Sequence, residues 1–178
     1  MVETLIIEGG SDTRNGSLRR GFHELLSKEI SEELIPRIIM GNGKSEAIKK
    51  FLSKTKSVNL LIDLDNNESF RDEDLINNNL QTHENIVFYM IQEMEAWFLS
   101  QTDILTSFYP DINWDNIIMN DISEIPKPSK VLGTLTEKSK SRKYHKIKHS
   151  VELLPLLDTK KLALDFPDFK ELIDSIKN

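Results

Sequence analysis

The chain has no cysteine among its 178 residues, and this absence removes several kinds of site at once. Without thiols there is no disulfide framework, no thiolate metal centre and no cysteine nucleophile. Long apolar runs are also missing, since the longest covers only residues 86–91 and cannot span a bilayer. The first residues lack a basic segment followed by an apolar one. We therefore expect no signal peptide, no membrane association and a cytoplasmic protein.

The remaining composition is typical of one globular domain. Hydrophobic residues make up 38% of the chain and charged residues 29%, which is too apolar a balance for intrinsic disorder. A length of 178 residues suits one full-sized domain better than two. We expect a single domain over residues 1–178.

The charge is unevenly distributed along the chain. A net charge of −6 argues against a uniformly basic nucleic-acid binder. Residues 126–150, however, contain eight Lys and Arg residues and one acidic residue, whereas the rest contains 15 basic and 28 acidic residues. Two interpretations stay open: a solvated lysine-rich loop, or a strip that follows a phosphate backbone beside an acidic site.

Short apolar runs alternate with helical patterns in the first hundred residues. The runs cover residues 4–7, 35–40, 58–62 and 86–89, and the helical patterns cover residues 18–30, 45–54, 72–80 and 93–99. Residues 101–178 have no strong strand signal and show helical patterns at 129–137, 149–157 and 168–177. We predict an α/β fold: a parallel sheet of about four strands flanked by helices over residues 1–100, with a helical C-terminal extension over residues 101–178 packed on it.

Acidic side chains follow three of the predicted strands. Glu8 follows the first run, Asp63 and Asp65 close the third, and Glu93 and Glu95 come after the fourth. The carboxyl ends of parallel strands meet at one edge of a sheet, where ligands bind. Carboxylates gathered there repel one another unless a hard cation such as Mg²⁺ neutralises them. The pattern predicts a divalent-cation site able to polarise a phosphate and activate water.

Each of these motifs also has a purely structural interpretation. On extended backbone Asp63 and Asp65 point to the same side and can share an ion, yet two loop aspartates also cap turns and helices. The glycines after Glu8 suit either a close approach to a ligand or an ordinary strand-to-helix turn. Glu93 and Glu95 face apart on a helix, so we expect only one of them in the site. Glu95 is either that residue or the buried partner of a basic residue.

Two segments resemble the signature of the Toprim domain. Glu8-Gly9-Gly10-Ser11-Asp12 resembles its opening E-G-x-x-D motif, and Asp63-Leu64-Asp65 resembles the Asp-x-Asp that follows its third strand. Three further segments resemble a domain-of-unknown-function family of small, Toprim-like bacterial proteins related to overcoming-lysogenization-defect nucleases. They are Met-Glu-Ala-Trp-Phe-Leu at 94–99, Glu-Ile-Pro-Lys-Pro at 124–128 and Lys-Tyr-His-Lys at 143–146. The similarity extends from residue 8 to about residue 169.

This resemblance implies a Toprim-like fold and a metal-dependent nuclease. Glu8 would act as general acid/base, Asp63 and Asp65 would complete the catalytic set and hold Mg²⁺ or Mn²⁺, and the Met-Glu-Ala-Trp motif favours Glu95 as a further metal ligand. The resemblance also implies a nucleic-acid substrate, a role in phage defence and an ABC-type ATPase as partner. The alternative is a non-catalytic subunit that binds such an ATPase. The sequence leaves open whether the chain forms a homo-oligomer.

Six basic residues are the candidates for contacting nucleic acid: Arg14, Lys127, Lys130, Arg142, Lys143 and Lys146. Arg14 follows the Glu8 loop and suits either a bidentate phosphate contact or a salt bridge. The other five lie in the basic segment, where they would guide a phosphate backbone towards the carboxylates.

Three other patterns are expected to play lesser roles. Gly43-Lys44-Ser45 resembles the end of a P-loop but lacks its earlier glycine, so we exclude nucleotide hydrolysis there and expect Lys44 to be a solvated helix-start lysine. His145 and His149 have helical spacing but no third ligand nearby, so we expect them at the surface or on a phosphate. We expect Trp97 and Phe98 in the core.

Overall fold

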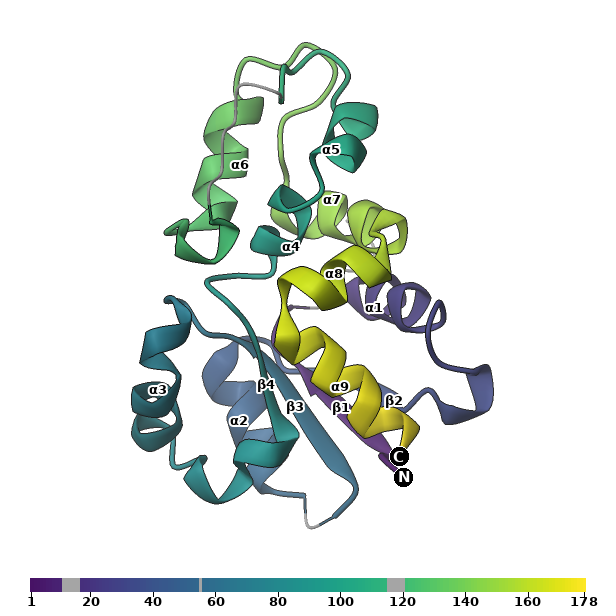
Figure 1. The fold of residues 1–178 in the computed structure, drawn as a ribbon, viewed down its shortest axis with the longest axis vertical. Helices are drawn as coiled ribbons and strands as arrows, with labels where there is room; N and C mark the ends of the chain where they lie inside the picture. Colours follow the sequence, from purple (N-terminus) through teal and green to yellow (C-terminus); the bar gives the residue numbers. More distant parts are fainter. Residues whose placement is uncertain (11–16, 55, 115–120) are drawn as a thin grey trace.

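A single four-stranded sheet forms the centre of the molecule (Figure 1). The computed structural model describes residues 1–10, 17–54, 56–114 and 121–178. The strands are β1 (Thr4–Ile7), β2 (Arg37–Met40), β3 (Val58–Asp63) and β4 (Val87–Met90). All pair in parallel, in the order β2-β1-β3-β4. The predicted α/β fold with about four parallel strands is confirmed.

The two central strands explain why the apolar runs are continuous rather than alternating. The side chains of Leu5, Ile6 and Ile7 on β1 are fully buried, as are those of Leu60 and Ile62 on β3. A strand covered by helices on both faces has no side that meets water, so each position favours an apolar residue.

Helices cover both faces of the sheet. α9 lies in front of the strands in Figure 1 and packs against β4, α1 packs against β2, and α2 lies behind β1 and β3. The helices of the described residues are α1 (Leu18–Leu26), α2 (Lys44–Leu52), α3 (Arg71–Asn77), α4 (Glu95–Leu99), α5 (Thr102–Phe108), α6 (Pro128–Thr136), α7 (Lys146–Leu153), α8 (Thr159–Asp165) and α9 (Pro167–Lys177). Short 3₁₀ turns are η1 (Glu32–Leu34), η2 (Glu68–Phe70), η3 (Gln81–Ile86), η4 (Ile122–Glu124) and η5 (Leu154–Leu156).

The C-terminal part is helical, as predicted, but it does more than extend the sheet unit. In Figure 1 α5, α6 and α7 lie beyond one end of the strands, and the chain then returns through α8 to place α9 on the sheet. Trp97 on α4 is fully buried and packs edge-on against Phe22 of α1 and Phe169 of α9. The predicted core positions of Trp97 and Phe98 are confirmed. The last helix therefore completes a core that residues 1–100 leave open.

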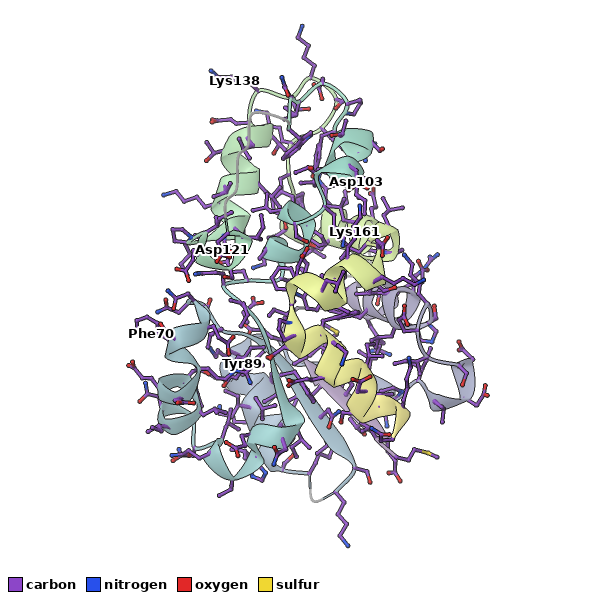
Figure 2. All side chains as sticks on the ribbon, in the orientation of Figure 1. Phe70, Tyr89, Asp103, Asp121, Lys138 and Lys161 are labelled. Atoms are coloured by element: carbon purple, nitrogen blue, oxygen red, sulfur yellow. The ribbon has the colours of Figure 1, made fainter. Side chains whose placement is uncertain are left out.

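Two helices lack a clear signal in the sequence. α5 and α8 each have seven residues, which is too short to show a periodic apolar face. An ion pair of 3.1 Å joins Lys161 of α8 to Asp103 of α5 at the surface (Figure 2). Both side chains are more than half exposed, so the pair adds little stability. No helix of the described residues has the length and apolar character needed to cross a membrane.

Candidate active site

The strand order places the ends of β1 and β3 at the point where the chain connections diverge. From β1 the chain passes to β2 on one side, and it later returns to β3 on the other side of β1. In open α/β sheets this switch point, at the carboxyl ends of the strands, is where ligands bind. Glu8 is the first residue after β1, and Asp63 is the last residue of β3. Two of the three predicted catalytic residues, Glu8 and Asp63, therefore come from neighbouring strands at this point.

The turn after Glu8 requires glycine at its first position. Gly9 has a φ of +136°, and a Cβ there would lie 2.7 Å from the Leu18 side chain. Its carbonyl oxygen accepts a hydrogen bond of 2.8 Å from the main-chain N–H of Asn42. Glycine suits this position because other residues rarely adopt such a φ.

Each of the two carboxylates accepts a hydrogen bond from a main-chain N–H group at the edge of the sheet. Glu8 Oε2 accepts from the main-chain N–H of Asp63 at 3.0 Å. Asp63 Oδ1 in turn accepts from the main-chain N–H of Met94 at 2.9 Å. Asp63 is buried, with 7% of its surface exposed. The ends of β1 and β3 and the start of α4 are thus joined through acidic side chains.

Glu95 supplies a third carboxylate from the first residue of α4 and has no exposed surface. Its Oε1 accepts a hydrogen bond of 2.7 Å from the Tyr144 hydroxyl and lies 3.6 Å from Lys146 Nζ. Its Oε2 is buried and has no hydrogen-bond partner among the described residues. Glu93 turns elsewhere and accepts from the main-chain N–H of Ser129 at 2.9 Å. Of the two glutamates, Glu95 is the one that joins the cluster.

The carboxylate cluster, Glu8, Asp63 and Glu95, consists of three acidic groups whose pKa values are all raised. Burial raises the pKa of Asp63 well above its ordinary value, and the charges of Glu8 and Glu95 raise it further. Burial also raises the pKa of Glu95, although Lys146 and Tyr144 oppose the change. Burial likewise raises the pKa of Glu8, and nearby Asp65 adds to it. All three carboxyl groups therefore hold a proton more tightly than exposed carboxyl groups do, chiefly because they are buried.

Lys146 is the cation that all of these acids share. Burial alone would lower the pKa of Lys146, but Glu95, Asp63, Glu93 and Glu8 outweigh burial and raise it. Lys146 thus carries its positive charge 3.6 Å from Glu95 and within electrostatic reach of the other three acids. This lysine was predicted to contact nucleic acid, and the structure places it against Glu95.

Asp65 lies outside the carboxylate cluster. Its φ is +62°, so the extended backbone that would turn Asp63 and Asp65 to the same side does not continue. The Asp65 side chain is half-exposed and lies between two lysines, 3.6 Å from Lys44 Nζ and 3.8 Å from Lys127 Nζ. The premise for a shared Asp63–Asp65 ligand pair is therefore wrong. A role of Asp65 as a cation ligand stays a prediction.

The other residues predicted to contact nucleic acid differ in exposure and in whether they already form an ion pair. Lys130 and Lys143 are exposed, as is Lys127 at the start of α6. Arg142 already pairs with Glu152 at 3.2 Å and lies over the Phe108 ring at 4.4 Å.

The basic segment does not lie beside the carboxylates along its whole length, and one predicted contact cannot be placed. Arg14 lies outside the described residues. Within the basic segment, Lys138 lies at the tip of the molecule farthest from the sheet (Figure 2). The surface beside the carboxylates is therefore supplied by only part of the basic segment.

Two expectations about lesser motifs are wrong. Lys44 is not solvated, because its side chain is only 19% exposed and Nζ lies 2.8 Å from Asp74 Oδ1. His149 is not at the surface, because it is buried and its Nδ1 lies 2.8 Å from the Tyr109 hydroxyl. Tyr144 is a functional candidate with no role predicted from the sequence. Its signal was its place in the Lys-Tyr-His-Lys segment at 143–146 that carries the family resemblance.

The carboxylate cluster offers the oxygen donors that a divalent cation prefers. Its side chains are not spaced so that three of them reach one ion. Within residues 1–10, 17–54, 56–114 and 121–178, no three histidine, aspartate or glutamate side chains converge on one metal-sized position. The donors are all carboxylate oxygens, which Mg²⁺ and Mn²⁺ prefer. Glu95 Oε2 is a buried acceptor in need of a partner. The ammonium of Lys146 supplies the nearest positive charge to Glu95.

Comparisons with known proteins identify the family without an activity. Searches of the curated proteins and of the solved structures find no match. A family model described as "Domain of unknown function (DUF4276)" matches residues 7–177. That range includes the carboxylate cluster, Tyr144 and Lys146. The chain therefore belongs to this family of uncharacterised domains, DUF4276.

Proposed function

We propose that the chain is a divalent-cation-dependent nuclease that hydrolyses phosphodiester bonds. The observation that carries the proposal is that Glu8, Asp63 and Glu95 lie near one another at the switch point of the sheet, where burial raises the pKa of each carboxyl group. Burying unpaired carboxylates is unfavourable unless they bind something positive. Such an arrangement is typical of sites that hold Mg²⁺ or Mn²⁺ for work on phosphates.

Each side chain has a defined task in this proposal. Asp63 and Glu95 would hold the cation, which would supply polarisation of the phosphodiester and a lower pKa of bound water. Glu8 is oriented by the N–H of Asp63, and its raised pKa moves the carboxyl towards the range useful for proton exchange. Glu8 accepts the proton of the attacking water. The water oxygen bonds to phosphorus, the bond from phosphorus to the leaving oxygen breaks, and the leaving oxygen takes up a proton from a solvent water molecule.

The Toprim resemblance supports the same proposal. The Glu8-Gly9-Gly10 motif and Asp63 lie on adjacent strand ends, as the E-G-x-x-D and Asp-x-Asp motifs of that fold require. A relationship to Toprim remains part of the proposal. The proposed role is the nuclease component of a phage-defence system that works with an ABC-type ATPase.

The proposed nucleic-acid path runs beside the carboxylate cluster. Lys127, Lys143 and Lys146 belong to the basic segment, and Lys127 and Lys146 reach acidic residues at the sheet edge. A phosphate backbone laid there would meet exposed ammonium groups before it reached the cluster. Lys130 extends this surface along α6.

Cleavage by a matched set of variants tests the proposal. The full chain is incubated with labelled single-stranded DNA, double-stranded DNA or RNA and Mn²⁺ or Mg²⁺, with and without the ATPase. We expect wild type to cleave at least one substrate, Asp63→Asn to lose cleavage by at least 100-fold, and Asp72→Asn, an exposed aspartate on α3, to match wild type. Equal cleavage by wild type and Asp63→Asn would reject the proposal.

A second candidate is a non-catalytic subunit that binds an ATPase. It is favoured by the contact of Lys146 with Glu95 and by the absence of a closed ligand set in the described residues. In this case Lys146 serves as a permanent counter-ion. Calorimetry that finds no Mn²⁺ or Mg²⁺ binding, together with a stable complex with the ATPase, would favour this function over the nuclease.

A further inference from the structure

We propose that Lys146 is an exchangeable counter-ion: its ammonium group neutralises the carboxylate cluster until a phosphate backbone withdraws it and a divalent cation replaces it. The inference rests on the proposed function, because it concerns how the same cluster acquires its cation. It makes Lys146 a residue that couples substrate binding to cation binding.

The position of Lys146 suits exchange between two partners. It is the first residue of α7 and lies in the basic segment. Its side chain is 55% exposed, whereas its partner Glu95 has no exposed surface. One end of the lysine therefore reaches a buried carboxylate, while much of its length is open to water and to an approaching phosphate.

The contact with Glu95 is close enough to neutralise charge but too long to be a hydrogen bond. The Nζ–Oε1 distance is 3.6 Å, beyond the usual range for N–H···O bonds. Oε1 already accepts from the Tyr144 hydroxyl, and Oε2 has no partner among the described residues. Tyr144 therefore holds Glu95 in place whether or not Lys146 is present. Withdrawal of the lysine leaves a preformed carboxylate with an open oxygen.

The affinity of the carboxylate cluster for a cation depends on whether the Lys146 ammonium group lies beside it. Its ammonium acts on Glu95, Asp63, Glu93 and Glu8 together. Without it, the cluster loses its shared positive charge, and its affinity for a divalent cation rises. By linkage, nucleic acid and cation then promote each other's binding by the same factor.

The test measures the affinity for Mn²⁺ directly. Calorimetry with the full chain compares wild type, Lys146→Met, Lys146→Arg and Lys148→Met. We expect Lys146→Met to bind Mn²⁺ at least tenfold more tightly than wild type, because the competing charge is gone. Lys146→Arg keeps the charge, and Lys148→Met removes an exposed charge two residues away on the same helix, so both should bind as wild type does.

A second measurement tests the link to nucleic acid. A phosphorothioate oligonucleotide, which resists hydrolysis, should tighten Mn²⁺ binding to wild type and change it little in Lys146→Met. If Lys146→Met binds Mn²⁺ no more tightly than wild type, the inference is wrong. If Lys146→Met does not fold, the test uses wild type alone. The inference is then wrong if the oligonucleotide does not increase the affinity of wild type for Mn²⁺.

Cleavage assays separate this inference from the proposed function. If wild type cleaves nucleic acid but Lys146→Met shows no gain in Mn²⁺ affinity, the counter-ion role is rejected and the nuclease stands. If Lys146→Met gains affinity but no variant cleaves, the counter-ion role stands and the nuclease is rejected. If neither wild type nor Lys146→Met binds Mn²⁺, both fall.

Discussion

Replacing Asp63 by asparagine should stabilise the protein while it abolishes the proposed activity. Asparagine keeps the size of the side chain and an oxygen that accepts from the Met94 N–H, the bond that Asp63 makes at 2.9 Å. It removes one of three neighbouring carboxylates. The perturbation therefore changes charge with little change in packing.

The direction of the effect follows from the raised pKa of Asp63, which burial causes first and Glu8 and Glu95 increase. At a pH above 3.8, the ordinary pKa of aspartate, the Asp63 carboxyl group has lost its proton in the unfolded chain. The folded chain retains this proton to a higher pH. Stability thus falls as pH rises from that value until the folded-state pKa is passed, and the loss remains at higher pH. Asparagine carries no such proton and avoids the loss.

The stability that wild type loses through Asp63 is about 1.4 kcal/mol for each tenfold difference in proton affinity between the folded and unfolded states. For a chain of this length, about 1.4 kcal/mol corresponds to roughly 3–6 °C in melting temperature. We therefore expect Asp63→Asn to melt at a higher temperature than wild type at pH 8 without divalent cations. At pH 4 the two proteins should differ much less.

Scanning calorimetry or circular dichroism between pH 4 and pH 8 measures this difference. Asp72→Asn is the control, since an exposed aspartate should change stability by no more than about 0.5 kcal/mol. Mn²⁺ at 100 times its dissociation constant should stabilise wild type by about 2.7 kcal/mol and Asp63→Asn by much less. A lower melting temperature for Asp63→Asn at pH 8 would refute the electrostatic reasoning.

Three further substitutions test the surroundings of the carboxylate cluster. Tyr144→Phe removes the hydrogen bond to Glu95 and should cost about 1.5–3 kcal/mol in urea denaturation, whereas a neutral result would mean that the hydroxyl does not support Glu95. Gly9→Ala should cost about 1–3 kcal/mol in thermal denaturation, because its φ is +136° and a Cβ there meets the Leu18 side chain; unchanged stability would contradict the strained turn. Trp97→Ala should cost about 3–5 kcal/mol, because the ring is fully buried between helices; a loss below 1 kcal/mol, measured by urea denaturation, would show that the aromatic contacts contribute little.

The sheet and half of the carboxylate cluster were predictable because both follow from local patterns and one rule of topology. Continuous apolar runs predict strands buried on both faces, and β1 and β3 have that character. Parallel strands end at a common edge, so Glu8 after β1 and Asp63 at the end of β3 were expected to meet there. The hydrogen bond from the Asp63 N–H to Glu8 confirms that they do.

The other features of the candidate site depend on backbone geometry and tertiary contacts that no local sequence pattern predicts. Asp65 leaves the cluster because a single residue adopts a left-handed φ, which period-two spacing cannot predict. Tyr144 and Lys146 reach Glu95 from some 50 residues farther along the chain, through helices that are positioned by packing on α4 and α1. A count of lysines indicates a basic segment, but it does not tell which lysine meets phosphate and which meets carboxylate.

The arrangement around Lys146 is difficult to explain by the needs of folding alone. A buried position that serves only packing is more stable with an apolar or neutral residue, because charged groups lose hydration there. Asp63 and Glu95 are nevertheless acidic and almost fully buried, and Glu8 adds a third carboxylate beside them. One exposed lysine compensates part of this charge from 3.6 Å, without a hydrogen bond. A site that opposes stability in this way, at the edge where α/β sheets bind ligands, has the properties expected of a centre kept ready for a cation and a phosphate.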